Sequence, residues 1–156
     1  METATILMIN LEFVNYCNLR CKWCSLDHTQ KKEIMNERLL HILFQNLISD
    51  RRFREIKGLN LWNGGEILLH PNFVKMLKVI KKYKDIFLKK GLSFPCVYLL
   101  TNGILLNKEL SNQLVNLDVV NVIRFSVDGG SKEKYEEIRK GAKWDIIFKN
   151  IQMSTS

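Results

Sequence analysis

Runs of apolar and polar positions along the chain predict its secondary structure. Four short apolar runs are typical of buried β-strands, and they lie at 5–14, 57–62, 96–101 and 120–127. Longer runs with apolar residues at every third or fourth position predict helices at 34–49, from Pro71 to about 90, and at 107–116, 131–140 and 144–153. Pro71 suits the first turn of a helix, where a backbone N–H has no helical partner.

The regular alternation of strand and helix predicts an α/β fold with parallel strands and right-handed crossovers. Two architectures fit this order, a doubly wound sheet and part of a (βα) barrel. The chain has 156 residues and shows no repeat or proline-rich linker. We therefore expect a single domain over residues 1–156, built from about four parallel βα units as a partial barrel.

Unusual polar and small residues lie at the carboxyl end of each predicted strand. They are the cysteine loop at 17–24, the Gly-Gly-Glu at 64–66, the Thr-Asn-Gly at 101–103 and the Ser-x-Asp-Gly at 126–129. The carboxyl ends of parallel strands meet at one rim, which is where βα folds bind ligands. The four clusters therefore predict one binding site. Trp62 and Trp144 are expected in the core.

Composition narrows the classes of function. The chain is 46% hydrophobic and 26% charged, as in an ordinary globular protein. Its start shows no basic leader, and no run is apolar enough to span a membrane, so we expect a cytoplasmic protein without membrane contact. Lys and Arg number 24 against 16 Asp and Glu, and many lysines lie on the helix after Pro71. A solvated helix face explains them better than a nucleic-acid partner does.

Three cysteines lie within eight residues, in the sequence CNLRCKWC. In a reducing compartment such a cluster points to metal or redox chemistry. Cys17, Cys21 and Cys24 could bind three irons of a [4Fe–4S] cluster and leave the fourth iron open to a small molecule. Alternatively, the three cysteines and His28 could hold a zinc ion. Cys96 starts a strand far from the rim, and we expect it to be a buried, non-ligating side chain.

These residues resemble the radical S-adenosylmethionine (radical SAM) superfamily. CNLRCKWC resembles the family's CxxxCxxC motif, with an aromatic residue, Trp23, before the third cysteine. LWNGGEILLHPNF, LLTNGILL and FSVDGG…YEEIRKGAKWDIIFKNI resemble later segments in the family's order, and together they span nearly the whole chain. Within the family, these segments most resemble the peptide- and protein-modifying branch, which often carries SPASM-type extensions.

The resemblance implies a function. Cys17, Cys21 and Cys24 would hold a [4Fe–4S] cluster, and S-adenosylmethionine would chelate its open iron. An electron from an external donor would cleave the cofactor to a 5′-deoxyadenosyl radical, which would abstract hydrogen from a peptide or small-molecule substrate. The implied cofactor-site residues are Trp23, Gly64, Gly65, Glu66, Thr101, Asn102, Ser126, Asp128 and Arg139.

Individual roles also come from the resemblance. Gly64, Gly65 and Glu66 would contact the amino group of the cofactor, Ser126 its ribose or carboxylate, and Arg139 its carboxylate. Glycine permits close backbone approach, and a guanidinium suits a carboxylate. Where the family often has proline after the glutamate, this chain has Ile67.

Members of this family usually continue for two more strand–helix units. We therefore expect a shortened barrel whose fourth strand has an unpaired edge, covered by self-association or by the C-terminal helix. Cofactor binding is expected more than full turnover. Two alternatives stay open, a non-catalytic zinc module and an inactive radical SAM fold that binds a partner.

Overall fold

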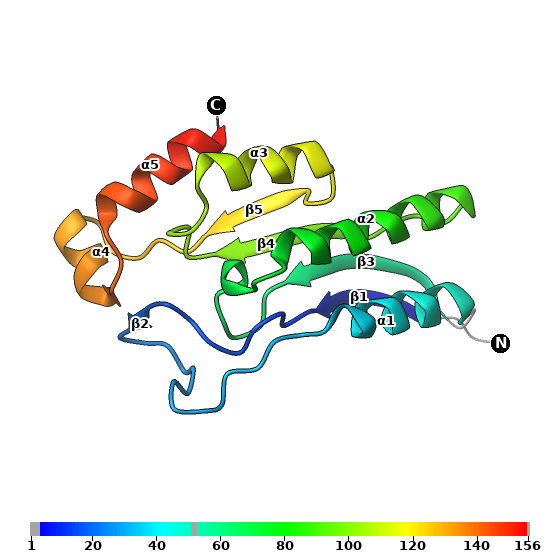
Figure 1. Cartoon of the computed structure of the whole chain (residues 1–156), viewed down its shortest axis with the longest axis horizontal. Helices are drawn as coiled ribbons and strands as arrows, with labels where there is room; N and C mark the ends of the chain where they lie inside the picture. The colour runs from blue at the N-terminus through cyan, green and yellow to red at the C-terminus, as the bar shows by residue number, and fades with distance from the viewer. Residues whose placement is uncertain (1–3, 51–52, 156) are drawn as a thin grey trace.

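The structure, a computed structural model, describes residues 4–50 and 53–155. Its main sheet has four parallel strands in the order β1-β3-β4-β5 (Figure 1). Their bounds are β1 Ala4–Asn10, β3 Phe53–Leu61, β4 Cys96–Thr101 and β5 Val122–Phe125. The predicted parallel α/β fold is confirmed.

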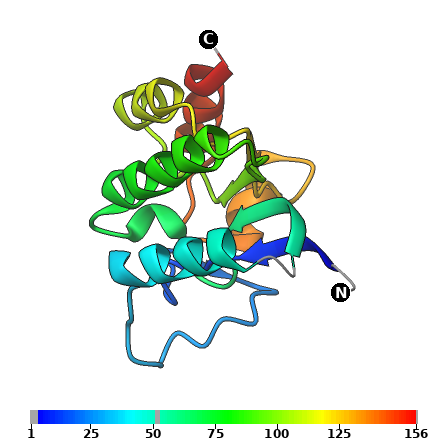
Figure 2. The same cartoon turned by 90° about the vertical axis from the view of Figure 1, so that its right-hand side faces the viewer.

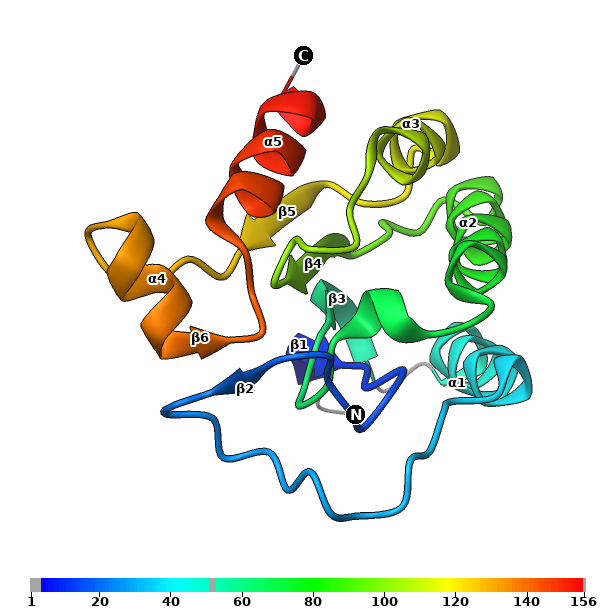
Figure 3. The same cartoon turned by 60° about the vertical axis from the view of Figure 1, so that its left-hand side comes forward.

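The helices are α1 Glu37–Ser49, α2 Phe73–Lys89, α3 Lys108–Leu117, α4 Lys132–Ile138 and α5 Trp144–Thr155, with a short 3₁₀ helix η1 at Ile67–Leu69. Helices α1, α2, α3 and α5 line one side of the sheet, whereas α4 lies beyond the carboxyl ends of the strands, beside β6 and α5 (Figure 1). Helix α1 contacts α2, α2 contacts α3, and α3 contacts α5. Figure 3 shows these four helices following the curve of the strands on its outer side. A doubly wound sheet would carry helices on both faces, so the partial barrel is the architecture present.

The main core lies between the strands and the helices. Leu59 and Leu61 of β3 and Val97 and Leu99 of β4 are fully buried, because alternate strand residues point to the helical side. Phe44 of α1 is also fully buried, and its ring stacks on that of Tyr83, with 4.9 Å between centroids. The side chains of α2 complete this core with Phe73, Met76, Leu77, Ile80 and Phe87.

Helix α1 begins three residues later than its apolar pattern predicts. Ile34 forms an isolated antiparallel bridge with Val14, and this holds the chain extended there. Asn36 then caps the helix, since its side chain accepts a hydrogen bond from the backbone N–H of Arg38 at 2.8 Å. The first predicted strand is likewise shorter, because β1 ends at Asn10.

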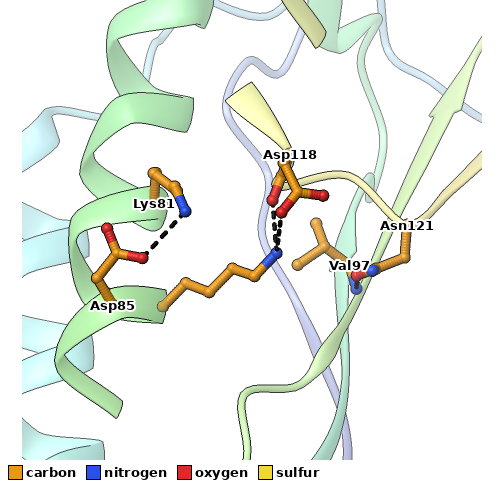
Figure 4. Close-up of polar contacts among 6 residues, drawn as sticks. Lys81, Asp85, Val97, Asp118 and Asn121 are labelled. Carbon is orange, nitrogen blue, oxygen red and sulfur yellow. Dashed lines mark hydrogen bonds and ion pairs between the residues drawn. The ribbon is translucent and has the colours of Figure 1, made fainter. Parts of the chain in front are cut away.

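Polar contacts join the turn between α3 and β5 to helix α2 and to strand β4 (Figure 4). Lys84 pairs with Asp118 at 3.1 Å, and Lys81 pairs with Asp85 along the helix at 3.0 Å. The Oδ1 atom of Asn121 accepts a hydrogen bond from the backbone N–H of Val97 at 2.8 Å, which fixes the start of β5 against β4. Lys75 also pairs with Glu37 of α1 at 2.9 Å, so three of the lysines on α2 have ion-pair partners.

A second, two-stranded sheet is absent from the sequence prediction. Strand β2, Arg20–Cys21, pairs antiparallel with β6, Arg139–Lys140, and so joins the cysteine loop to the segment after α4 (Figure 3). The chain between β2 and α1 forms a long loop at one side of the molecule (Figure 2). As expected, β5 lies at an edge of the main sheet, and β1 lies at the other.

Within the described ranges, 4–50 and 53–155, no helix combines the length and the apolar character that crossing a membrane requires.

Candidate functional site

A cavity of about 130 Å³ opens at the carboxyl-end rim of the strands. Ten of the twelve residues predicted for the site line it, from segments far apart in the sequence: Cys17, Cys21, Cys24, Gly64, Gly65, Glu66, Thr101, Asn102, Ser126 and Arg139. Leu19, Trp62 and Leu100 supply the remaining wall. The rim therefore brings all four sequence clusters together.

The three cysteines of the loop are free thiols. Cys17 and Cys21 are half-buried, and Cys24 is exposed. Burial raises the pKa of the Cys17 thiol, against the backbone hydrogen bond from Leu19. Burial also raises the pKa of the Cys21 thiol, which the nearby Arg139 guanidinium opposes. A positive or soft ligand would stabilise the thiolates that burial alone disfavours.

Each of the three sulfur atoms has an N–H donor close by. The backbone N–H of Leu19 lies 3.4 Å from Cys17 Sγ, and the backbone N–H of Leu26 lies 3.5 Å from Cys24 Sγ. Arg139 Nη1 lies 3.9 Å from Cys21 Sγ. Such N–H···S contacts stabilise anionic sulfur and tune metal–sulfur centres. Each sulfur of the loop therefore has a nearby donor that would favour its anionic form.

The β2–β6 pairing explains how Arg139 reaches the cysteines. Cys21 and Arg139 are directly opposite in this pair, although they are far apart in sequence. Next to them, the backbone N–H of Lys22 donates to the carbonyl of Ile138 at 2.9 Å. Arg139 Nη2 also forms an ion pair with Asp128 at 2.7 Å. The guanidinium is therefore held between the thiol and a carboxylate.

Glu66 lines the rim cavity, and its carboxylate is already engaged within the protein. It is only 4% exposed, and its carboxylate accepts hydrogen bonds from Thr101 Oγ1 at 2.7 Å and from the backbone N–H of Asn102 at 2.7 Å. It also accepts from the backbone N–H of Leu68 at 3.2 Å, and so caps η1. Burial raises the pKa of this carboxyl against these three hydrogen bonds. Three of its roughly four acceptor positions are filled by the protein itself.

Gly65 packs against the entry to the cysteine loop. A Cβ at this position would lie 2.2 Å from the carbonyl oxygen of Val14 and 2.6 Å from that of Tyr16. The next residue, Glu66, donates its backbone N–H to Tyr16 at 2.9 Å. The close approach that this glycine permits is therefore made by the chain's own backbone, which seats the loop.

Asn102 joins the end of β4 to the cysteine loop. Its Nδ2 atom donates to Asn18 Oδ1 at 2.8 Å and lies 3.8 Å from Cys17 Sγ. Its Oδ1 atom accepts from the backbone N–H of Ile104 at 3.0 Å. The amide is thus engaged on both sides, which orients it toward the thiol.

Two predicted residues lie beside the cavity without lining it. Asp128 contacts the site through its ion pair with Arg139. Trp23 is 79% exposed and lines a neighbouring, wider cavity of about 580 Å³ together with Cys24. Ser126 and Asp128 follow β5, which ends at Phe125, so both belong to the loop after the strand.

Trp62 was expected in the core, and that expectation is wrong. Its side chain is 39% exposed and lines both the rim cavity and the neighbouring one. The strand period carries the signal that was missed, because Leu59 and Leu61 face the helices and the next residue points the other way. Cys96 is half-buried rather than buried, and it lies at the amino end of β4, opposite the rim.

The described side chains at the rim do not form a binding site for a single metal ion. Among the residues that the structure describes, no three His, Cys, Asp or Glu side chains converge on one metal position. This holds for the set of three cysteines and His28 as well. A [4Fe–4S] cluster attaches each thiolate to a different iron, so it does not require the sulfurs to meet at one point.

The family of the chain follows from a sequence comparison. The model of the radical SAM superfamily matches residues 11–155, which is almost the whole chain. The chain belongs to the radical SAM superfamily. The family resemblance of its four motifs is thereby confirmed.

Curated proteins with different activities in their names are similar to this chain in sequence. A tungsten-containing aldehyde ferredoxin oxidoreductase cofactor-modifying protein from Pyrococcus furiosus is 31% identical over 119 residues, covering 76% of this chain and 30% of the relative. A GTP 3′,8-cyclase from Chlorobaculum tepidum is 26% identical over 152 residues, covering 94% of this chain and 40% of the relative. The chain thus spans less than half the length of these curated relatives.

Solved structures share the fold. A structure of anSMEcpe with bound AdoMet superposes with a TM-score of 0.75 at 19% identity, covering 97% of this chain and 41% of the other. The BtrN structure in complex with AdoMet and 2-DOIA has a TM-score of 0.64 at 20% identity, covering 96% and 56%. These likenesses show that the partial barrel matches part of the barrel in those proteins.

Proposed function

We propose that this chain is the core of a radical SAM enzyme, which binds a [4Fe–4S] cluster and S-adenosylmethionine at the rim cavity. One observation carries the proposal: three free thiols, each with a nearby N–H donor, line one cavity with the residues of the Gly-Gly-Glu, Thr-Asn and Ser segments and with Arg139. Family membership supports it.

The donor set fits such a cluster. Soft thiolates are the ligands that iron–sulfur clusters take from proteins, and three of them leave one iron open. The chain has one further cysteine, Cys96, and it cannot supply a fourth thiolate because it lies at the amino end of β4, away from the rim. With an electron from an external donor, the bound cluster and S-adenosylmethionine would supply a 5′-deoxyadenosyl radical for hydrogen abstraction from the substrate.

The surrounding residues have distinct tasks in this proposal. Arg139 would offer its guanidinium to the carboxylate of the cofactor, with Asp128 holding its orientation through the 2.7 Å ion pair. Glu66 would hold the rim in shape through its hydrogen bonds to Thr101 and Asn102. Gly64, Gly65 and Ser126 would lie beside the cofactor, and Trp23 would flank it from the neighbouring cavity.

The apolar wall also has a task. Leu19 and Leu100 line the cavity, and Leu19 is only 2% exposed. Such a wall excludes water from a reactive intermediate. We infer a peptide or a small molecule as substrate, since the solved relatives include anSMEcpe with a bound Cp18Cys peptide and the curated relatives include a GTP 3′,8-cyclase.

Anaerobic reconstitution with iron and sulfide tests the proposal. We expect bound iron and labile sulfide, and a [4Fe–4S]⁺ electron paramagnetic resonance (EPR) signal after dithionite reduction that changes when S-adenosylmethionine is added. Cys21→Ser should lose the cluster, whereas the matched control Cys96→Ser should keep it. Uptake of one zinc per chain would support the zinc module instead. A cluster whose EPR signal does not change when S-adenosylmethionine is added would support an inactive fold that binds a partner.

A further inference from the structure

Two buried hydrogen-bond donors near Cys21 have no acceptor in the described part of the chain. They are the hydroxyl of Tyr135 and the Nε atom of Arg139. The side chain of Tyr135 is fully buried, in a small core formed with Leu19, Ala142 and Ile147. The half-buried side chains of the first two loop cysteines pack against this same core.

An unpartnered hydroxyl at this position is unfavourable. A buried O–H that has lost its bond to water and gained no other costs free energy, and phenylalanine would fill the same space without that cost. The charged and ionisable groups around the phenol are Arg139, Cys21, Asp128 and Glu136. Arg139 and Asp128 are already paired with each other, and Glu136 accepts from the backbone N–H of Trp144 at 3.0 Å.

Cys21 is the other neighbour, and its Sγ atom is not a hydrogen-bond partner of the hydroxyl in this structure. The acceptor would therefore be the sulfur that a bound cluster places at Cys21. The backbone hydrogen bond between Lys22 and Ile138 and the β2–β6 pair hold the cysteine loop against the segment that follows Tyr135 in α4. Arg139 reaches Cys21 with its Nη1 atom, while its Nε atom stays unpaired. Arg139 lines the rim cavity, whereas Tyr135 does not line it and lies in the small core against which Cys21 packs. A cluster bound at Cys21 would bring anionic sulfur toward both unpaired donors.

We propose that Tyr135 is a positioning residue for the cluster, whose hydroxyl donates a hydrogen bond to the Cys21 thiolate or to a sulfide on the same iron. This inference rests on the proposed function. A hydrogen bond to cluster sulfur stabilises the additional negative charge of the reduced state, so it raises the reduction potential. Tyr135 would therefore make the cluster easier to reduce.

Stability of the protein without iron gives the first test. Tyr135→Phe removes an unpaired hydroxyl and should leave the urea midpoint unchanged or higher. Tyr83→Phe is the matched control, because Tyr83 is 4% exposed and its hydroxyl contacts His41 Nδ1 at 3.0 Å. The control should lower the midpoint. A Tyr135→Phe variant that loses stability as the control does, or fails to fold, would show that the hydroxyl has a partner in the protein and would overturn the inference.

The reconstituted protein gives the second test, by EPR-monitored redox titration. Tyr135→Phe should bind the same iron and sulfide as the wild type, with a lower midpoint potential and a changed EPR signal of the reduced cluster. Tyr83→Phe should match the wild type in both. An unchanged potential in Tyr135→Phe would overturn the inference and leave the proposed function standing. Failure of the wild type itself to assemble a cluster would refute the proposed function instead.

Discussion

The two adjacent glycines of the Gly-Gly-Glu segment should differ sharply in their tolerance of alanine. At Gly65 a Cβ would lie 2.2 Å from the carbonyl oxygen of Val14 and within 2.8 Å of two backbone atoms of Tyr16. At Gly64 it would lie 2.6 Å from Glu12 Oε1 and otherwise no closer than 3.7 Å to any atom. A carboxylate tip can rotate away, whereas two stretches of backbone cannot separate without moving the cysteine loop.

The magnitude follows from these contacts. Overpacking costs roughly 1–3 kcal/mol and more where nothing can yield. Displacing the loop also breaks the bond from the Glu66 N–H to the Tyr16 carbonyl, worth about 1 kcal/mol. We therefore expect Gly65→Ala to lower the free energy of unfolding by about 3–4 kcal/mol, out of the roughly 5–15 kcal/mol typical of a domain. Gly64→Ala should cost less than about 1 kcal/mol.

Urea unfolding followed by circular dichroism measures the difference. With a slope of about 2 kcal/mol per molar urea, Gly65→Ala should lower the midpoint by about 1.5–2 M. The Gly64→Ala variant serves as the matched control for the change in backbone entropy. Equal losses in the two variants, or a loss below about 1 kcal/mol for Gly65→Ala, would refute the steric argument.

Three other predictions use the same unfolding assay. Burial raises the pKa of the Glu66 carboxyl above its usual 4.5. The contribution of this group to the free energy of unfolding is therefore complete below pH 4.5 and declines as the pH rises through the folded pKa. Glu66→Gln should remove this dependence of stability on pH, and an unchanged dependence would contradict the assignment. Hydrogen bonds from Lys134 and Lys22 lower the pKa of Glu137 from 4.5 to about 2, so their contribution is present above 4.5 and lost as the pH falls toward 2. Glu137→Gln should flatten the dependence of stability on pH across that window. An equal response of the two proteins would contradict the prediction and show that solvent screens these exposed pairs. Phe44→Ala should cost about 3–5 kcal/mol because the ring is fully buried, and a loss below about 2 kcal/mol would mean that its neighbours collapse into the space.

The secondary structure could be predicted from the sequence where several local signals agreed. Strand β4 was predicted to the residue, since Pro95 precedes it, alternate residues are buried, and Asn102-Gly103 ends it. The start of α1 was predicted three residues too early. Ile34 continues the apolar pattern of the helix, but it bridges to Val14, a partner that no local window contains.

The membership of the site could be predicted for a topological reason. Parallel strands place their carboxyl ends at one edge, so clusters that follow successive strands must meet there. Residues of all four clusters do line one cavity. The engagement of each side chain was beyond prediction, because hydrogen-bond partners depend on which backbone comes near. Glu66 is occupied by the end of β4, and Asp128 is occupied by Arg139.

By itself, the sequence determined the order of strands and helices, the family and the residues that gather at the rim. These follow from hydrophobic period, turn chemistry and motif spacing, which are properties of short segments. Only the tertiary structure decided the β2–β6 pair, the exposure of Trp62 and the burial of Tyr135 beneath the cysteine loop. Each of these depends on contacts between distant segments, and such contacts exist only once the chain has closed around its core.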